Sequence, residues 1–236
     1  MAGDMIFKFK QFAVDQAGCA MKINTDGVLL AASVSAPVSK YVLDIGTGTG
    51  VIALMLAQRF PEALIDAVEI DLQAAETASR NARNSVYDER ICVHHSSFQD
   101  FDTHRQYDLI VSNPPFFVKD LKNEEQRKGI ARHADEDFFE MLLRKSATLL
   151  SEEGRLWLVL PLKQAEVVAQ TGAGMGLFVV EKVYMHSDES KPPFRMMICL
   201  TKSSRECLEN HLYIYVAEKV HTQAYKDLLK DFFLHY

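Results

Sequence analysis

Apolar and polar residues follow two different periods along the chain from residue 40 onward. Short apolar runs predict buried strands at 40–46, 63–71, 91–95, 107–113 and 154–161. Stretches with an apolar residue at every third or fourth position predict helices over 51–60, 72–84 and 136–150. Strands that alternate with helices form βαβ units, so we expect a mostly parallel, doubly wound α/β sheet covered on both faces. Its ligand crevice should lie at the carboxyl ends of the strands.

The two ends of the chain do not show the regular alternation of strands and helices. Residues 1–40 begin with an extended arm in which Phe7 and Phe9 alternate with lysines, followed by a short helix with Thr25 or Asp26 as its N-cap. After residue 163 we expect another helix, and then strands at 176–186 and 195–202 that form a C-terminal antiparallel hairpin. Strand 211–216 and helix 224–233 complete the predicted order. We find no linker, so residues 1–236 are predicted to be a single domain with the arm, about 1–40, packed on it.

Composition narrows the class of protein. The chain is 48% hydrophobic and 25% charged with a net charge of −6, so any cationic surface for nucleic acid must be local. No apolar run approaches the ~20 residues that cross a bilayer, and no export signal is visible, so we expect a cytoplasmic protein with no membrane partner.

The four cysteines lack CxxC spacing, and Cys92 and Cys199 lie in apolar runs, which predicts buried reduced thiols. We interpret His94 and His95 as structural and expect no metal.

A glycine cluster follows the predicted strand 40–46 and opens the next helix. Asp44, Gly46, Gly48 and Gly50 form a D-x-G-x-G-x-G string. Such glycines allow a tight turn and a close ligand approach, and the helix offers unpaired N–H groups. Glu69 ends the following strand, where an acid accepts hydrogen bonds from a ribose diol. The pair predicts a site for a nucleoside cofactor.

The glycine string is compatible with two kinds of cofactor. Residues 48–53 also satisfy the dinucleotide pattern G-x-G-x-x-A, but Asp44 would meet a pyrophosphate badly and suits a cationic sulfonium amino acid. The string resembles motif I of the class I S-adenosylmethionine (SAM) methyltransferases, so SAM is preferred to NAD. The resemblance implies a Rossmann-like fold, with Asp44 and the three glycines facing SAM and Glu69 on its ribose. It places the adenine of SAM against Ile70, Ser97 and Phe98.

The strand at 107–113 runs into Asn113-Pro114-Pro115-Phe116. The side-chain oxygen of Asn113 and the carbonyl of Pro114, directed by Pro115, are two acceptors aimed at one point. A planar NH2 group supplies the two matching donors, and its nitrogen can then attack a sulfonium methyl without a strong base. Phe116 would stack on the substrate. The string resembles the NPP[YF] motif of methyltransferases that act on adenine N6, guanine N2 or the glutamine amide.

Further strings along the chain indicate which of these three amines is the acceptor. F-K-F-K-Q-F, then M-K-x-x-T-D-G-V-L-L, A-R-H at 131–133 and K-D-F-F-L at 230–234 resemble the bacterial tRNA(Val) adenine-N6 methyltransferase family. The resemblance implies SAM-dependent methylation of the exocyclic N6 amine of the adenosine 3′ of the anticodon. It also places Thr25 and Asp26 beside the amino-acid end of SAM. The sequence is compatible with a monomer.

A tRNA substrate needs cations near Phe116. The segment 119–133 has a local charge of +2, and we interpret it as a mobile lid that orders on RNA, although a solvated loop of mixed charge has the same composition. The candidate RNA-binding residues are Lys119, Lys122, Arg127, Lys128 and Arg132. Two alternatives stay open: a protein glutamine-amide methyltransferase of the release-factor type, and a non-catalytic SAM- or RNA-binding partner.

Overall fold

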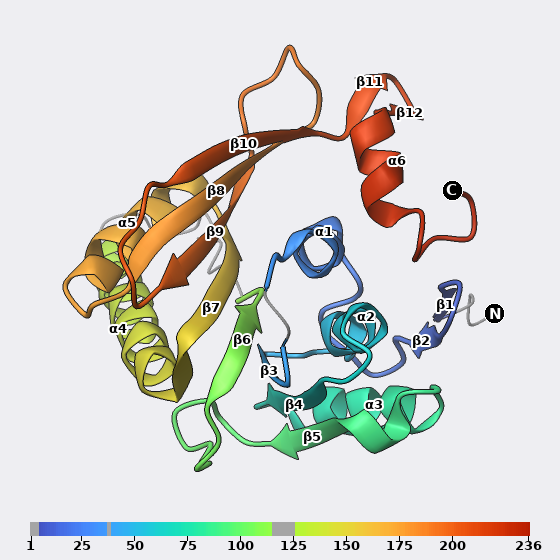
Figure 1. The fold of residues 1–236 in the computed structure, drawn as a ribbon, viewed down its shortest axis with the longest axis horizontal. Helices are drawn as coiled ribbons and strands as arrows, with labels where there is room; N and C mark the ends of the chain where they lie inside the picture. The colour runs from blue at the N-terminus through green and yellow to red at the C-terminus, as the bar shows by residue number, and fades with distance from the viewer. Residues whose placement is uncertain (1–4, 37–38, 115–125) are drawn as a thin grey trace.

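The central element is a twisted sheet of eight strands in the order β10-β8-β9-β7-β6-β3-β4-β5 (Figure 1). The structure is a computed structural model that describes residues 5–36, 39–114 and 126–236, with the backbone alone for 126–136. The predicted fold class, an α/β sheet that is mostly parallel and has a C-terminal antiparallel hairpin, is confirmed.

Five neighbouring strands run parallel, with β3 between β4 and β6. Their carboxyl ends therefore meet at one edge of the sheet, which is where a doubly wound fold binds its ligand. These strands are β3 (Tyr41–Ile45), β4 (Leu64–Glu69), β5 (Ile91–His95), β6 (Tyr107–Ser112) and β7 (Leu150–Leu160).

Helices cover both faces of this sheet (Figure 1). Helices α1 (Thr25–Ser33), α2 (Val51–Arg59) and α3 (Leu72–Arg83) lie on one face. Helices α4 (Gln126–Leu149) and α5 (Leu162–Ala173) lie on the other. Two cores of buried apolar side chains result, one on each side of the sheet. Among the described residues, no helix combines the length and apolarity that crossing a membrane requires.

The C-terminal strands extend the sheet in the antiparallel sense. Strand β9 (Arg195–Thr201) lies between β7 and β8 (Phe178–His186) and is antiparallel to both, which confirms the predicted hairpin. Strand β10 (Leu208–Tyr213) adds an outer edge parallel to β8. The chain continues through β11 (Tyr215–Ala217), β12 (Val220–His221) and α6 (Gln223–Leu229).

The N-terminal arm is a hairpin of β1 (Ile6–Lys8) and β2 (Ala13–Asp15) that lies near the other end of the chain (Figure 1). The backbone N–H of Lys10 donates to the carbonyl of Phe232, and Lys10 Nζ donates to the carbonyl of Tyr236 at 2.8 Å. Lys10 therefore joins the N-terminal arm to the C-terminal segment.

Three predictions about local structure are wrong. Helix α1 is capped by Asn24, whose side-chain oxygen accepts the N–H of Gly27 at 2.9 Å, and not by Thr25 or Asp26. Helix α4 begins at Gln126 and not near residue 136, so the second half of the predicted lid is helical. A glycine inside a helix, here Gly129, costs only about 1 kcal/mol, which the rest of a long helix offsets.

The third wrong prediction concerns a cysteine. Cys92 is exposed, because its strand β5 is the outer strand of the sheet and one of its faces is only partly covered. Cys199, on the interior strand β9, is buried as predicted, and burial raises the pKa of its thiol to about 12. All four cysteines are free thiols.

Candidate active site

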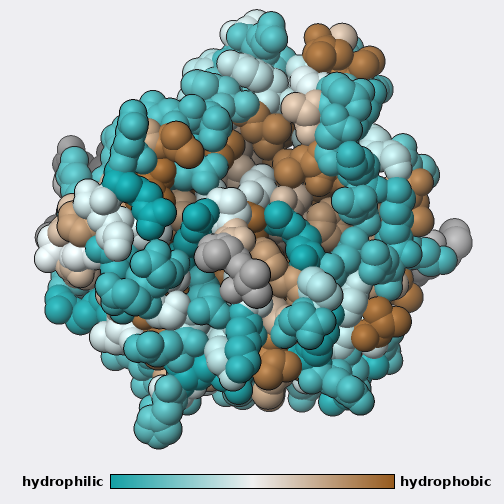
Figure 2. Space-filling view, viewed as in Figure 1, coloured by the Kyte–Doolittle hydropathy of each residue, from teal (hydrophilic) through white to brown (hydrophobic). Residues whose placement is uncertain are grey.

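A cavity of about 420 Å³ opens where the strands β3, β4 and β6 end. This volume lies within the range of small-molecule sites. On the face drawn in Figure 2, hydrophilic residues predominate, and apolar ones gather toward the centre beside the end of β6. The lining includes Gly46, Gly48, Val68, Glu69, Ile70, Ser97, Phe98, Ser112, Asn113 and Pro114. The crevice predicted at the carboxyl edge of the sheet is therefore present.

The glycine loop forms one wall of this cavity. Gly46, Gly48 and Gly50 have backbone φ angles of +73°, +56° and +82°, values that residues other than glycine rarely adopt. A Cβ on Gly46 or Gly48 would meet nothing within 4 Å, so both face open space, whereas one on Gly50 would lie 3.3 Å from Cα of Ala78 in α3. Two of the glycines therefore leave room for a ligand, and the third permits close helix packing.

Glu69 ties the glycine loop to the end of β4. Its Oε2 accepts the N–H of Gly48 at 2.9 Å, and its Oε1 accepts the N–H of Asp71 at 2.9 Å. A carboxylate offers about four acceptor sites, so each oxygen can still accept a ligand hydroxyl. The side chain is buried and lines the cavity, as a ribose-binding acid must.

Asp44 lies behind this wall and has no solvent exposure. Its Oδ2 accepts a hydrogen bond from the hydroxyl of Thr47 at 2.6 Å, whereas its Oδ1 has no partner among the described residues. Burial raises the pKa of Asp44 to about 7, and nearby Glu69 adds to the rise, while the Thr47 and Ala53 hydrogen bonds oppose it. A buried unpaired acceptor is costly, and such strained groups concentrate at functional sites.

A second buried oxygen without a partner in the described chain belongs to Asn113, at the end of β6. The Nδ2 of the same side chain donates to Oδ1 of Asn24 at 3.2 Å. The hydroxyl of Ser112 donates to the carbonyl of Ile45 at 2.8 Å and holds the ends of β6 and β3 together. Asn113 and Pro114 line the cavity, and the buried amide oxygen of Asn113 has no hydrogen-bond partner among the described residues. Pro115 and Phe116 lie outside the described residues, and their roles stay predictions.

Comparison with known proteins identifies the family. A family model described as the methyltransferase small domain matches residues 17–169. The chain belongs to this methyltransferase family. A tRNA1(Val) (adenine(37)-N6)-methyltransferase of Pedobacter heparinus is 56% identical, and the alignment covers 97% of each chain. A protein of the same description from Bacteroides thetaiotaomicron is 40% identical, again over 97% of each chain.

A solved structure shows the same fold. A predicted O-methyltransferase from Agrobacterium tumefaciens superposes with a TM-score of 0.69, over 88% of this chain and 96% of that one. At 19% identity this similarity establishes the fold and nothing more. The chain's membership of a methyltransferase family confirms SAM, and not NAD, as its cofactor.

The methyltransferase cavity has three predicted adenine contacts. Ile70 lines it and is 69% exposed, which leaves an apolar surface free for a base. Phe98 also lines it but is largely buried in the core, with Nζ of Lys145 over its ring at 5.3 Å. The hydroxyl of Ser97 donates to Asp100 at 2.7 Å.

Two further predicted groups are not placed in this cavity by the structure. Asp26 is buried in an ion pair with Nε of Arg195 at 2.8 Å, Thr25 is exposed, and neither is among the described lining residues. Their contact with SAM stays a prediction. Lys119 and Lys122 lie outside the described residues. Arg127, Lys128 and Arg132 belong to α4, whose described side chains begin at Asp137, so their contact with RNA also stays a prediction.

Residues near the N-terminus also line the methyltransferase cavity, and the sequence did not predict them. Cys19, Ala20 and Met21 line the cavity, and Met21 is 49% exposed. Phe138 and Met141, three positions apart on α4, line it as well. Apolar periodicity marks these two as helix-face residues but cannot tell a cavity from a core. For Cys19 to Met21, the signal in the sequence was the similarity to the family of the M-K-x-x-T-D-G string that begins at Met21.

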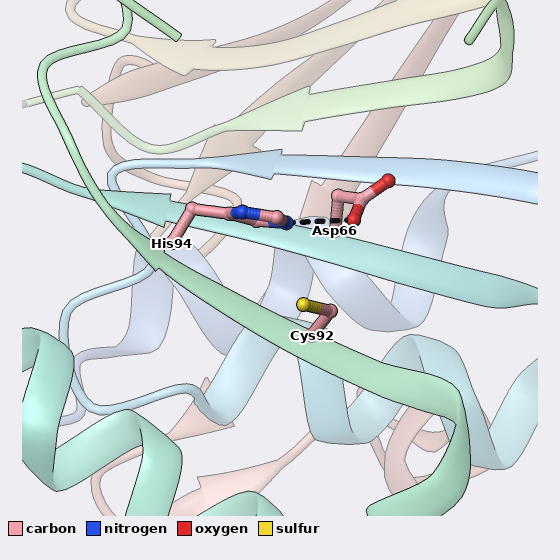
Figure 3. A group of neighbouring side chains, drawn as sticks. All are labelled: Asp66, Cys92 and His94. Carbon is pink, nitrogen blue, oxygen red and sulfur yellow. Dashed lines mark hydrogen bonds and ion pairs between the residues drawn. The ribbon is translucent and has the colours of Figure 1, made fainter. Parts of the chain in front are cut away.

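His94 has companions that the sequence did not reveal (Figure 3). Its Nε2 lies 2.8 Å from Oδ1 of Asp66, and Cys92 offers a third possible ligand atom within 4.8 Å. Arg105 and Tyr107 also donate to Asp66 Oδ2, at 2.6 and 2.8 Å. Burial raises the pKa of Asp66, but the hydrogen bonds and the guanidinium outweigh it and hold the pKa below its usual value. The carboxylate is thus already compensated, which supports a structural role for His94.

Proposed function

We propose that this chain transfers a methyl group from SAM to the exocyclic N6 amine of an adenine in tRNA. The observation that carries the proposal is the buried, unpaired oxygen of Asn113 in the cavity that the glycine loop also lines. The names of the relatives support adenine 37 of tRNA1(Val), the position 3′ of the anticodon, as the acceptor.

The residues of the cavity fit SAM. The open glycine wall at Gly46 and Gly48 leaves space for the methionine part, and Glu69 has acceptor sites left for the ribose hydroxyls. The exposed apolar surface of Ile70 can pack on the adenine. When bound, SAM supplies an electrophilic methyl group on a positively charged sulfur. The buried negative charge of ionised Asp44 favours a cation at this end of the sheet.

The acceptor side holds the amine. Oδ1 of Asn113 accepts one N–H of the amine, and the carbonyl of Pro114 accepts the other. Accepting both hydrogens would return lone-pair density to the nitrogen, which could then accept the methyl group that bound SAM supplies, with S-adenosylhomocysteine as the leaving group. The excess proton leaves the nitrogen for solvent after transfer, so the chain needs no general base. Its contribution is positioning and preorganised electrostatics.

A glutamine amide presents the same two donors, so the chemistry by itself does not separate a protein substrate from tRNA. The relatives support tRNA, because they match this chain over almost its whole length and are all named for an adenine of tRNA1(Val). No feature of the described residues favours the protein alternative.

The test is methyl transfer from radiolabelled SAM to unmodified tRNA1(Val) transcript, with a release factor as the parallel acceptor. Nucleoside digestion should yield N6-methyladenosine, and a transcript with guanine at position 37 should accept no label. Asn113→Ala should lower the rate of transfer by about 100- to 1,000-fold while SAM still binds. A matched control is Asn210→Ala, on the outer strand β10, which should transfer at the wild-type rate. Label on the release factor alone would refute the RNA substrate.

A further inference from the structure

Asn24 and Asn113 meet beside the cavity although they are 89 residues apart in sequence. Oδ1 of Asn24 accepts two hydrogen bonds, from the N–H of Gly27 at 2.9 Å and from Nδ2 of Asn113 at 3.2 Å. The first turn of α1 is in close contact with the Asn113 amide, since a Cβ on Gly27 would lie 3.4 Å from Asn113 Nδ2.

The hydrogen bonds fix which end of each amide is which. A backbone N–H can only donate, so the Asn24 atom that it reaches must be the oxygen. That oxygen can only accept, so the Asn113 atom facing it must be the NH2 group. The orientation of Asn113 is thus set by a chain of obligatory donors and acceptors that begins at the backbone of α1.

This orientation is the one that the reaction requires. A flipped Asn113 would place two oxygens against each other and turn its NH2 group toward the cavity. An amino group there would face the N–H donors of an acceptor amine and could not accept from them. With the observed orientation, Oδ1 is the atom without a partner in the described chain.

We infer that Asn24 is a positioning residue for methyl transfer, which holds the amide of Asn113 with its oxygen toward the acceptor amine. The inference rests on the proposed function for its effect on rate. It assigns to the N-terminal segment a role in the acceptor half of the site, in addition to the cavity lining formed by Cys19, Ala20 and Met21.

Three substitutions separate this role from helix capping. Asn24→Asp keeps an acceptor for both Gly27 and Asn113. Asn24→Ser keeps a good helix cap, but its shorter side chain cannot reach Asn113. Asn24→Ala removes both. Thr222 caps α6, because its side chain accepts the backbone N–H of Tyr225. Thr222→Ala is therefore the control for a lost helix cap at a residue outside the site.

We expect kcat on tRNA to fall about tenfold in Asn24→Ser and Asn24→Ala, the worth of one hydrogen bond, and to stay near wild type in Asn24→Asp. The KM for tRNA and the Kd for SAM should change less than twofold in all three. Thr222→Ala should lower the melting temperature but leave kcat unchanged. Wild-type kcat in Asn24→Ser would overturn the inference.

A second readout does not depend on the substrate. The chain has six asparagines, so selective ¹⁵N labelling gives a short list of side-chain NH2 signals, and the Asn113 signal is assigned by its loss in Asn113→Ala. Its hydrogen-bonded proton should lie downfield in the wild type and in Asn24→Asp, and should move upfield in Asn24→Ser. An unmoved signal would overturn the inference even if tRNA is not the acceptor. Failure of the proposed function alone would instead show as absent transfer in the wild type with the shift intact.

Discussion

The cofactor side and the acceptor side of the cavity are held in different ways. On the cofactor side, the glycine loop and Glu69 are joined by a side-chain to backbone bond between neighbouring strand ends. On the acceptor side, Asn113 depends on Asn24, a side chain from the far end of the sequence. The glycine loop and Glu69 therefore come from consecutive strand ends of the sheet, whereas the orientation of Asn113 depends on how the N-terminal segment packs on the sheet.

The largest effect should come from removing the acceptor of the amine. Asn113→Ala should lower kcat on tRNA by about 100- to 1,000-fold, as loss of one preorganised polar contact does elsewhere. The Kd for SAM, measured by calorimetry, should stay within about threefold, because the glycine loop and Glu69 are untouched. A comparable loss of SAM affinity would mean that the two sides are not separable.

The cofactor side should respond in the opposite manner. Glu69→Gln removes the charge that accepts the Gly48 and Asp71 N–H groups, so SAM should bind about 10- to 100-fold more weakly. At saturating SAM, kcat should remain within about threefold. Glu62→Gln, an exposed acid before the same strand, is the matched control and should leave SAM binding unaltered. An unchanged Kd in Glu69→Gln would contradict the assignment of this carboxylate.

The buried Asp44 should make the stability of the SAM-free protein depend on pH. Its pKa is raised from 3.8 to about 7, so between those values the folded state holds a proton that the unfolded state does not. Stability from this group is fully present below pH 4 and is lost as pH rises toward 7, by up to about 1.4 kcal/mol per pH unit.

Urea unfolding of the wild type and of Asp44→Asn at pH 5 and pH 7 measures this contribution. The neutral variant should lose less stability between the two pH values, and at pH 7 it should be the more stable protein although its SAM binding is weakened. Equal changes in the two proteins would show that Asp44 does not carry the dependence.

The smallest expected effect tests whether Asp26 belongs to the cofactor side of the cavity. Asp26→Asn removes the ion pair with Arg195 and should lower the free energy of unfolding by about 1–2 kcal/mol. If the pair is only structural, the Kd for SAM will not change. A rise of tenfold or more would support the family resemblance, which places Asp26 beside the amino-acid end of SAM. Asp227→Asn, which loses an exposed pair with Lys230, should change neither quantity.

Periodicity was sufficient for the parallel part of the fold, because β3, β4 and β6 are buried on both faces, and β3 and β6 run into a glycine cluster and a proline pair. It failed where tertiary contacts decide. The exposed outer strand makes Cys92 accessible, and α4 extends upstream to Gln126, beyond the apolar periodicity at 136–150 that predicts it. The cap at Asn24 was missed because Thr25 and Asp26 beside it are equally good capping types.

The candidate site divides along the same line. The glycines, Glu69 and Asn113 were predicted because their chemistry follows directly from residue type at a strand end. The pairing of Asn113 with Asn24 could not be predicted, since nothing in a one-dimensional pattern marks a contact across 89 positions.

The union of the two chain ends also affects the order of biosynthesis. The arm that continues into Cys19–Met21 is fastened by Lys10 to the carbonyls of Phe232 and Tyr236. On the ribosome, the five parallel strands between residues 41 and 160 can pair before residues 228–236 have emerged. The arm gains its anchor only when those residues emerge. In a nascent chain, the glycine loop and Glu69 can therefore be in place before Cys19, Ala20 and Met21 complete the lining of the cavity.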